Sequence, residues 1–495
     1  MREDAVAAGA RDAPVRAAFL AACIVFFVLF VFAPRAMLGD PDTLWHVHFG
    51  QYIARTMTFP VVDEWSATAA GERWITKEWL SQLLYAGAYQ LAGYNGVVGL
   101  AASAIALAFG VLTCAWLRRL PPALVIFCVG AAFCLSVQHF LARPHVLAYP
   151  LMAIWVSGLA RACDEARAPS RWLLVVLVLW ANMHGGFSLG LVLAVGFAAT
   201  AVWESKGPRS ALARAWGVFL VLAIFASGLT PYGFESLLVT PRLMSFGSAL
   251  SIIVEWRPPD LKADKVSLLV LLGWVSLLLR RASPFSLPRI GLVLLIVYLF
   301  LTAARNGEVL GFVLPFVIPA AAGRHEERVP FRSMVTPALV ASIAFLLSVG
   351  VSAIWRKDLA PFPEALPEDC LRFARESGIV GDRLLNGYEF GGYLITQGVP
   401  TFIDGRAELF GPDRIRAFND FQLVRGADTR SYLDLHGIVW TLLDPQLPVV
   451  RLLDQLPGWQ RVFGGGSCVI HRRVETSASA PVGNRGPSLQ QGSRP

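Results

Sequence analysis

Long apolar stretches recur through the first 350 residues of this chain, and they constrain its fold more than any other feature. Eleven of them approach the 20 or so residues that a helix needs to cross a bilayer. They fall at 17–33, 97–117, 122–141, 145–160, 172–183, 186–203, 215–230, 265–280, 290–303, 309–322 and 334–354. Only 16% of the residues are charged, against about 25% in soluble proteins. The sequence therefore predicts a polytopic α-helical membrane protein with about 11 spans, the first of them uncleaved.

Basic residues are unevenly distributed over the connections between these stretches. If the N-terminus is inside, every inner connection carries at least two Arg or Lys, whereas the outer turns carry far fewer. This is the positive-inside pattern, and it explains the net charge of +8 without any nucleic-acid partner. We expect a multi-pass protein of the bacterial inner (cytoplasmic) membrane, with the N-terminus cytoplasmic and the C-terminal region periplasmic.

Three regions are expected outside the membrane, on the extracytoplasmic side. The first outer loop, 34–96, contains an amphipathic interfacial helix at Trp74–Tyr85, and a second outer loop spans 231–264. In the C-terminal region the pattern predicts a helix at Glu368–Ser377 and strands at Tyr393–Thr396, Thr401–Ile403 and Val439–Leu443. The expected domains are a transmembrane domain at 1–355, an extracytoplasmic α/β domain at 356–474 and a disordered tail at 475–495.

The cysteines add one open question. Cys370 and Cys468 are the two that fall in the predicted outer domain, where an oxidising compartment would allow them to pair. Two separate buried thiols remain the alternative, because sequence does not give their Cα separation. The spacing of the seven cysteines matches no structural zinc site.

An acidic, aromatic stretch, Gly39–His46, directly follows the first span. It contains Asp40, Asp42 and His46, and charge at the edge of a membrane helix is costly and usually marks chemistry or ion handling. A solvated loop in which Asp42 caps the following helix is the alternative. As functional groups, Asp40 and Asp42 would supply a general base or hold a divalent cation such as Mg²⁺ or Mn²⁺.

Three predicted outer turns carry Arg or His, against the positive-inside trend. They are Arg143-Pro144-His145, Asn182-Met183-His184-Gly185-Gly186 and Arg305-Asn306-Gly307-Glu308. Each could be an ordinary exposed turn. Together, cations on the outer side suggest a bound anion, and a lipid-linked phosphate suits the fork of an arginine.

This layout resembles the GT-C superfamily of membrane glycosyltransferases, which use polyprenyl-phosphate-linked sugars. The resemblance rests on the first span, the acidic motif in a long first outer loop, the interfacial helix, the many spans and the outer C-terminal domain. It implies that Asp42 or Asp40 is the catalytic base or helps to bind a metal. Many members have adjacent acids, Asp-Glu, where this chain has Asp42-Thr43, so which aspartate acts and whether metal is needed stay open.

A C-terminal stretch carries a looser resemblance. Asn386–Ile395, followed by Pro400–Glu408, is similar to the Trp-Trp-Asp-Tyr-Gly region of oligosaccharyltransferase catalytic subunits, although the paired tryptophans are absent. We expect Gly391-Gly392 to form a tight turn with positive φ. Asp404-Gly405-Arg406 is either part of a site or a β-turn with a local ion pair.

The predicted function is the transfer of a sugar from a polyprenyl-phosphate-linked donor to an acceptor hydroxyl, with inversion. The acceptor would be a glycan, a lipid or a protein, and membrane lipid would surround the enzyme. The predicted substrate-binding residues are His46, Glu78, Arg143, His145, Asn182, His184, Arg305, Asp404, Arg406 and Glu408. The alternatives are an O-antigen ligase or polymerase, which Arg143, His145 and His184 keep open, a transporter of lipid-linked sugars, and a non-catalytic scaffold.

Overall fold

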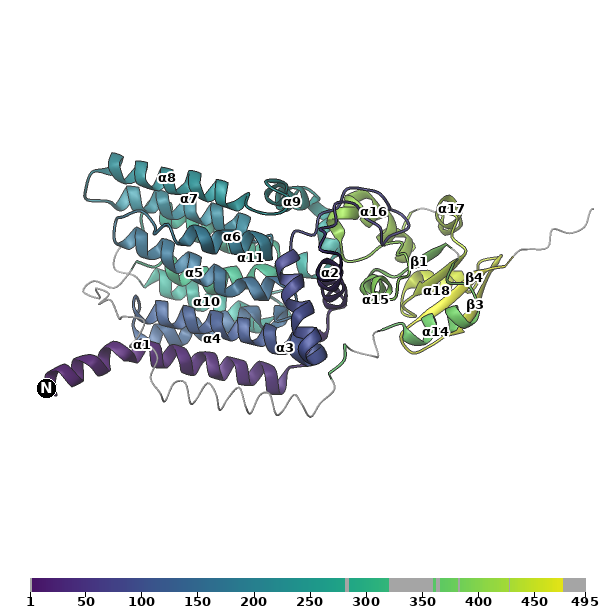
Figure 1. Cartoon of the computed structure of the whole chain (residues 1–495), viewed down its shortest axis with the longest axis horizontal. Helices are drawn as coiled ribbons and strands as arrows, with labels where there is room; N and C mark the ends of the chain where they lie inside the picture. The colour runs from purple at the N-terminus through teal and green to yellow at the C-terminus, as the bar shows by residue number, and fades with distance from the viewer. Residues whose placement is uncertain are drawn as a thin grey trace, which may run out of the picture. The chain divides into compact units, whose positions relative to one another are not determined.

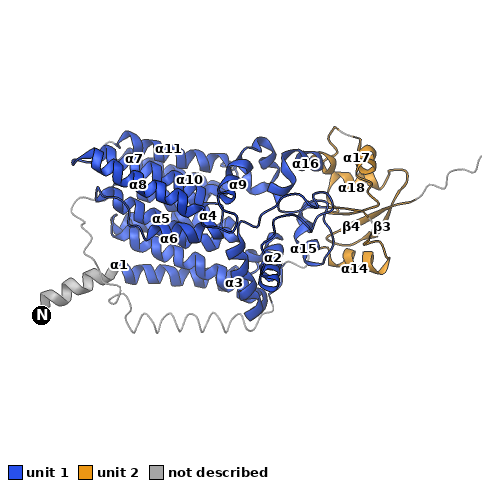
Figure 2. Cartoon of the chain, turned by 45° about the horizontal axis from the view of Figure 1, so that its top comes forward, with its two compact units in different colours: residues 1–366, 387–419 blue, residues 367–386, 420–495 orange. Residues whose placement is uncertain are grey.

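A computed structural model describes residues 2–280, 285–319, 359–361, 366–381, 383–426 and 428–474, with side chains from Pro14 onward. The chain divides into two compact units, coloured in Figure 2. Unit 1 comprises Met1–Leu366 and Gly387–Asn419, and unit 2 comprises Pro367–Asn386 and Asp420–Pro495. Residues 387–419 thus group with the helical unit, although the sequence predicted a domain boundary at 355/356, a position outside the described residues.

Unit 1 is a bundle of apolar helices (Figure 1). A helix overlaps each of the first ten predicted spans, and the eleventh, 334–354, lies outside the described residues. These helices are α1 (Arg2–Phe27, continued by the π-helical turn η1, Val28–Phe32), α3 (Trp79–Leu117), α4 (Pro122–Ser136), α5 (Pro144–Asp164), α6 (Leu173–Met183), α7 (Phe187–Glu204), α8 (Arg209–Ser227), α10 (Lys265–Leu279), α11 (Leu287–Thr302) and α12 (Gly307–Val317). Within the described chain, six helices are long and apolar enough to cross a membrane and three more are shorter. The protein is therefore a membrane protein by composition, and eleven remains a prediction.

Proline and glycine explain several helix boundaries. Pro122 and Pro144 occupy first-turn positions of α4 and α5, where the N–H that proline lacks would have no helical partner. Helix α3 is broken at Ala92 and Gly93, and Gly93 has φ 56°, a conformation that glycine adopts at little cost. This break separates a first segment, near the predicted interfacial helix, from the predicted span. The helix begins at Trp79 and not at Trp74 as predicted, and Trp74 is buried beside the guanidinium of Arg406.

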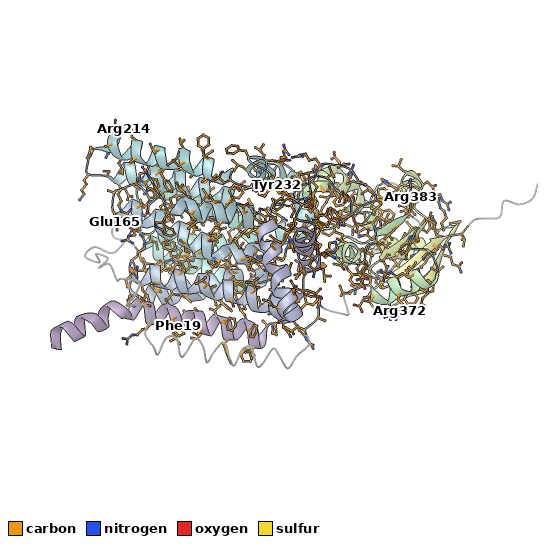
Figure 3. All side chains as sticks on the ribbon, in the orientation of Figure 1. Phe19, Glu165, Arg214, Tyr232, Arg372 and Arg383 are labelled. Carbon is orange, nitrogen blue, oxygen red and sulfur yellow. A yellow bond between two sulfur atoms is a disulfide. The ribbon has the colours of Figure 1, made fainter. Side chains whose placement is uncertain are left out.

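Successive connections of unit 1 meet at alternate ends of the bundle. At one end Arg119, which follows α3, pairs with Asp164 of α5, and Arg289 of α11 pairs with Glu204 of α7 at 2.8 Å. At the other end the backbone of Ala142, between α4 and α5, bonds to Met37 of the first loop. Figure 3 shows Glu165 and Arg214 at the former end and Tyr232 at the latter. We call these the opposite end and the first-loop end.

The first-loop end carries most of the irregular structure. Its short helices are α2 (Asp42–Thr56), η3 (Val137–His139), α9 (Glu235–Met244), η4 (Gly247–Ile252), η5 (Val254–Trp256) and η6 (Ala304–Asn306). The segment 387–419 packs here as η9 (Tyr388–Phe390), α15 (Gly391–Thr396) and α16 (Ala407–Gln422, which ends in unit 2). A parallel bridge joins Ser66 of the first loop to Thr401.

Three predictions for this segment are wrong. Tyr393–Thr396 is helical, within α15, and Thr401–Ile403 forms only that isolated bridge. Gly391 begins α15 with φ −56°, and Gly392 is likewise absent from the positive-φ glycines. These two glycines instead allow close approach: a Cβ on Gly392 would lie 2.4 Å from the carbonyl oxygen of Pro41. Gly392 therefore lets the segment dock on the first loop, whereas Gly391 lets the segment fold against its own Asp404, whose Cβ would lie 2.3 Å from a Cβ on Gly391.

Unit 2 is a small α/β unit built on a four-stranded mixed sheet. Its strands are β1 (Leu384–Asn386), β2 (Trp440–Leu443), β3 (Trp459–Gly464) and β4 (Val469–Arg473), in the order β1-β2-β4-β3. Strand β1 pairs with β2 in parallel, and the other pairs are antiparallel. Its helices include α14 (Glu368–Glu376), α17 (Thr429–Leu435) and α18 (Pro448–Leu453). The predicted helix at 368–377 and the strand at 439–443 are confirmed, and Cys370 is disulfide-bonded to Cys468.

Candidate active site

The centre of the first-loop end is a cluster of partly buried acids around one arginine. The Arg143 guanidinium contacts Asp40 Oδ2 and Asp42 Oδ2 at 2.9 Å each and Glu255 Oε2 at 3.0 Å. Arg305 contacts the other oxygen of Glu255 at 2.9 Å. We call Asp40, Asp42, Arg143, Glu255 and Arg305 the carboxylate cluster. It brings together four residues predicted from the sequence.

Backbone contacts hold Arg143 in the cluster. The N–H of Ala142 donates to Met37 O at 2.7 Å, and the Thr43 hydroxyl donates to Ala142 O at 3.1 Å. The Tyr85 hydroxyl donates to the carbonyl of Arg143 itself at 2.9 Å. The turn before α5 is thus fixed to the first loop on both sides of the arginine.

The first loop positions the two aspartates differently. The Asp40 carboxylate accepts the backbone N–H of Asp42 at 2.8 Å, so Asp40, and not Asp42 as the capping alternative supposed, stabilises the start of α2. Asp42 is the first residue of α2, and its Oδ1 accepts the indole N–H of Trp45 at 2.9 Å. A Cβ on Gly405 would lie 2.0 Å from that oxygen, so the segment 387–419 passes directly beside Asp42.

Burial and neighbouring charges give Asp42 and Glu255 very different pKa values. Burial raises the pKa of Asp42 to about 8, against the attraction of Arg143 and with the help of the neighbouring Asp40 charge. Burial also acts to raise the pKa of Glu255, but Arg143 and Arg305 together outweigh it and hold that pKa at about 2. Two acids on one guanidinium are therefore set for different roles, because Asp42 exchanges a proton near neutral pH whereas Glu255 stays charged.

A second polar group, the histidine group, adjoins the cluster through α2 and consists of His46, Glu78, His145 and His184. Gln82 accepts from the Thr76 hydroxyl, so its amide donates to His46 Nδ1 at 3.3 Å, and Gly186 N–H donates to His184 Nδ1 at 3.1 Å. Both imidazoles therefore direct Nε2–H to Glu78, at 4.0 and 3.7 Å from its two oxygens. Burial lowers the pKa of His46 and of His184 well below the ordinary value, which keeps both rings neutral.

His145 completes this group. Its Nε2 donates to the carbonyl of His139 at 2.8 Å, and its ring centroid lies 6.1 Å from that of His184. The distances from His46 Nε2 and His184 Nε2 to the Glu78 oxygens exceed hydrogen-bond length. A water molecule or a substrate hydroxyl can bridge gaps of this size.

The other predicted residues are engaged with protein partners. Asn182 donates to Val178 O and Leu229 O and accepts from the Trp79 indole. Arg406 is fully buried, and its guanidinium bonds to both oxygens of Asp404 and to Asp63 of the first loop at 2.6–2.8 Å. Glu408 pairs with Lys77 at 2.6 Å. The local ion pair expected between Asp404 and Arg406 is present, and its contacts fasten the segment 387–419 to the first loop.

The carboxylates do not fit a resident divalent metal in this arrangement. Magnesium and manganese ligands converge about 2.1 Å from a common point, whereas these oxygens converge on the Arg143 guanidinium. In the described part of the chain, no group of three or more His, Cys, Asp or Glu side chains has a geometry that could hold a metal ion.

Sequence reasoning did not select Glu255, which lies in the loop 231–264 directly before Trp256. The available signal was an acid beside an aromatic residue in a loop predicted to lie outside the membrane. Lys77, Gln82 and Gly405 were also not selected, and nothing in their local spacing distinguishes them.

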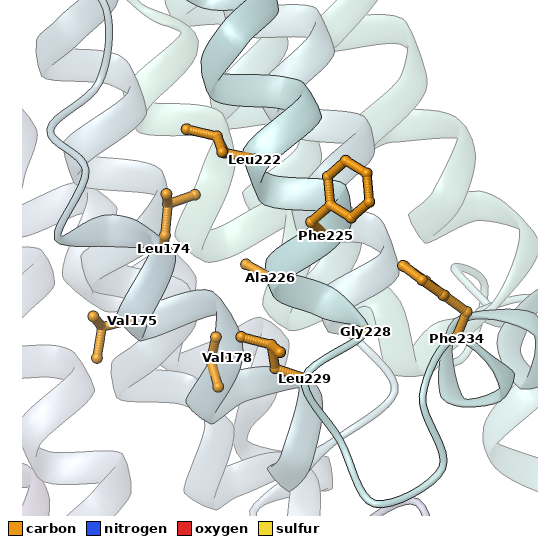
Figure 4. A pocket seen from close by; sticks show the side chains of 9 residues that line it. All are labelled: Leu174, Val175, Val178, Leu222, Phe225, Ala226, Gly228, Leu229 and Phe234. Atoms are coloured by element: carbon orange, nitrogen blue, oxygen red, sulfur yellow. The ribbon is translucent and has the colours of Figure 1, made fainter.

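An apolar groove of about 520 Å³ lies on unit 1 between α6, α8 and the start of α9 (Figure 4). Its lining residues are Leu174, Val175, Val178, Leu222, Phe225, Ala226, Gly228, Leu229 and Phe234. All are apolar, so the groove provides no charged or hydrogen-bonding side chain and is suited to contact with lipid.

No protein-family model matches the sequence, and no curated protein matches it significantly. Among solved structures, the crystal structure of the oligosaccharyltransferase of Archaeoglobus fulgidus in the apo form is similar, at 10% sequence identity and a TM-score of 0.34. The similarity covers 87% of this chain and 69% of that chain. A TM-score this low does not define a shared fold, so inference about activity has to start from the site.

Proposed function

We propose that this chain is a membrane glycosyltransferase that moves a sugar from a polyprenyl-phosphate-linked donor to an acceptor hydroxyl on the extracytoplasmic side. The observation that carries the proposal is the contrast between Asp42 and Glu255 on one guanidinium. A general base works best when its pKa lies near the working pH, and the pKa of Asp42 is raised to about 8. The GT-C-like layout of the sequence gives the first-loop acid the same role.

In the proposed reaction, the acceptor hydroxyl gives its proton to the Asp42 carboxylate as its oxygen attacks the anomeric carbon. The bond from that carbon to the phosphate oxygen breaks, and the lipid phosphate leaves with the bonding electrons. A single displacement of this kind inverts the anomeric configuration.

Arg305 is a better candidate than Arg143 for binding the departing phosphate. Arg143 already pairs with three carboxylates, whereas the ion pair described for Arg305 is with Glu255 alone. The Arg305 guanidinium also lies 4.4 Å from the centroid of the Trp256 ring, which fixes its plane. Arginine recognises phosphate through such a planar fork of donors.

The disulfide supports an extracytoplasmic location for unit 2, because such bonds persist in oxidising compartments. We expect Cys370 and Cys468 of the native protein to resist maleimide labelling until a reductant is added after denaturation. Free labelling of both thiols without reductant would instead place unit 2 in a reducing compartment.

The function is tested by deleting the gene and analysing envelope glycans and lipids by mass spectrometry. We expect one sugar to be lost and to be restored by the wild-type protein but not by Asp42→Asn. Unchanged envelope glycans, or full restoration by Asp42→Asn, would contradict the proposal.

An O-antigen ligase or polymerase is the second candidate, and the histidine group is the observation that favours it. In that reaction His184 and Arg143 would carry the chemistry. Loss of product in His184→Ala together with full activity in Asp42→Asn would favour it. Loss in Asp42→Asn alone would favour the glycosyltransferase.

A further inference from the structure

Arg143 occupies the position that a metal ion takes in many acid clusters. One of its terminal nitrogens donates to Asp40 at 2.9 Å and to Glu255 at 3.0 Å, and the other contacts Asp42 at 2.9 Å. The three acids come from two loops that are far apart in the sequence, and they converge on this one side chain.

Three carboxylates are also the hard oxygen ligands that Mg²⁺ and Mn²⁺ prefer. A divalent ion among the three acids would have to share their oxygens with a guanidinium only a few ångströms away. Repulsion between the two cations would be strong in a site with this little water, because the side chains of the cluster are each 14–19% exposed.

The arginine cannot readily move aside. Hydrogen bonds to Met37 O and from Thr43 hold the preceding residue, and the Tyr85 hydroxyl holds the carbonyl of Arg143. Pro144 then starts α5 directly after the arginine. The backbone that carries the guanidinium is therefore fixed beside the three acids.

We propose that Arg143 is a built-in cation that takes the place of a divalent metal among Asp40, Asp42 and Glu255, so that these acids bind such a metal only when Arg143 is removed. The proposal does not depend on which reaction the site performs. It concerns the cation that neutralises the acids, and a binding measurement reads it out.

The test is a Mn²⁺ titration of the full-length protein in lipid nanodiscs, after treatment with chelator, followed by electron paramagnetic resonance. We expect no saturable Mn²⁺ site in the wild type, and one site in Arg143→Ala that disappears in the Asp40→Asn/Arg143→Ala double variant. Arg414→Ala is the matched control, because Arg414 pairs with Glu72 at an exposed position and its loss leaves the cluster intact.

Arg143→Gln is measured in parallel, since an amide keeps more of the side-chain volume if the alanine variant does not give a monodisperse protein. A saturable Mn²⁺ site in the wild type that is lost in Asp40→Asn would overturn the proposal, and this result needs no Arg143 variant. Failure of both folded Arg143 variants to gain a site would also overturn it, since the acids would then not be metal ligands even when freed. Because the readout is Mn²⁺ binding, neither result bears on glycosyl transfer, which the envelope analysis tests separately.

Discussion

Arginines meet carboxylates at both ends of unit 1, but they bind different partners. At the opposite end, Arg119 donates to the carbonyls of Phe316 and Ile318 as well as to Asp164. Arg289 there donates to the carbonyl of Val317 and to Glu204. At the first-loop end, the hydrogen bonds and ion pairs that the described chain gives to the Arg143 and Arg305 guanidinium groups all run to carboxylates.

The balance of charge differs as well. At the opposite end, Arg119 and Arg289 pair with two acids, Asp164 and Glu204, and they also donate to carbonyls at the end of α12, which no helical N–H reaches. The carboxylate cluster has three acids for two arginines. The acid in excess is the one whose pKa rises to about 8. The comparison indicates that the balanced group around Arg119 and Arg289 stabilises the bundle, whereas the acid-rich carboxylate cluster is suited to proton transfer.

The largest effect on stability should come from breaking the opposite end. Arg119→Ala removes the closer of the two arginines that pair with Asp164, leaving Arg289 at 3.6 Å, and removes the donor to the carbonyls of Phe316 and Ile318. A buried polar group left without its hydrogen bond typically costs about 1–3 kcal/mol. We expect a clear fall in Tm by scanning fluorimetry, with transfer by the folded fraction retained. Arg209→Ala, at the exposed first residue of α8, is the control and should change Tm little. Equal Tm values for the two variants would contradict a stabilising role for Arg119 and its partners.

At the first-loop end, replacing Arg305 should weaken binding of the donor and leave the fold intact. A hydrogen bond to a charged group contributes about 1.5–3 kcal/mol, so we expect Arg305→Ala to raise the KM for the donor about 10- to 100-fold. Arg257→Ala is the matched control, because the carbonyl of Arg257 accepts the N–H of Ala304, next to Arg305, whereas its guanidinium donates to the carbonyls of Ser251 and Ile252. A KM that changes equally in both variants would argue against a phosphate at Arg305.

The smallest expected effect is the dependence of the rate on pH. A raised pKa keeps most Asp42 protonated at pH 7, so the base form grows as the pH rises through about 8. We expect kcat/KM to rise about tenfold between pH 7 and pH 9. Because the Asp40 charge helps to raise this pKa, Asp40→Asn should shift the profile to lower pH. A flat profile in the wild type would mean that Asp42 is not the titrating group.

How much of the fold and of the site could be predicted from the sequence depends on how far apart in the chain the contacting residues lie. Asp40 and Asp42 were identifiable because acids at the edge of a span are unusual, and Arg143 and Arg305 because they lie on the side where basic residues are rare. The helices were predicted well because hydropathy is a local property. Sequence did not indicate that Arg143 binds the acids, since its partners lie 103 and 112 residues away in the chain.

The segment 387–419 shows the same limit. Its Gly-Gly pair suggested a turn, because a local pattern cannot tell positive φ from close approach to another segment. Arg406 pairs with Asp63, which lies 343 residues earlier in the chain. The spacing of residues in the sequence cannot predict a buried pair of this kind. The sequence therefore suggested a site from its unusual charges, and the contacts between distant segments assembled it.

The most direct test compares Asp42→Asn with Asp164→Asn, one acid from each end, in a single-turnover assay of purified protein with a polyprenyl-phosphate-linked sugar. Loss of a general base typically lowers the rate about 10²–10⁴-fold. We expect that loss in Asp42→Asn with little change in Tm, and a lower Tm with the rate of the folded protein preserved in Asp164→Asn. Transfer at the wild-type rate by Asp42→Asn would contradict the assignment of Asp42 as the base.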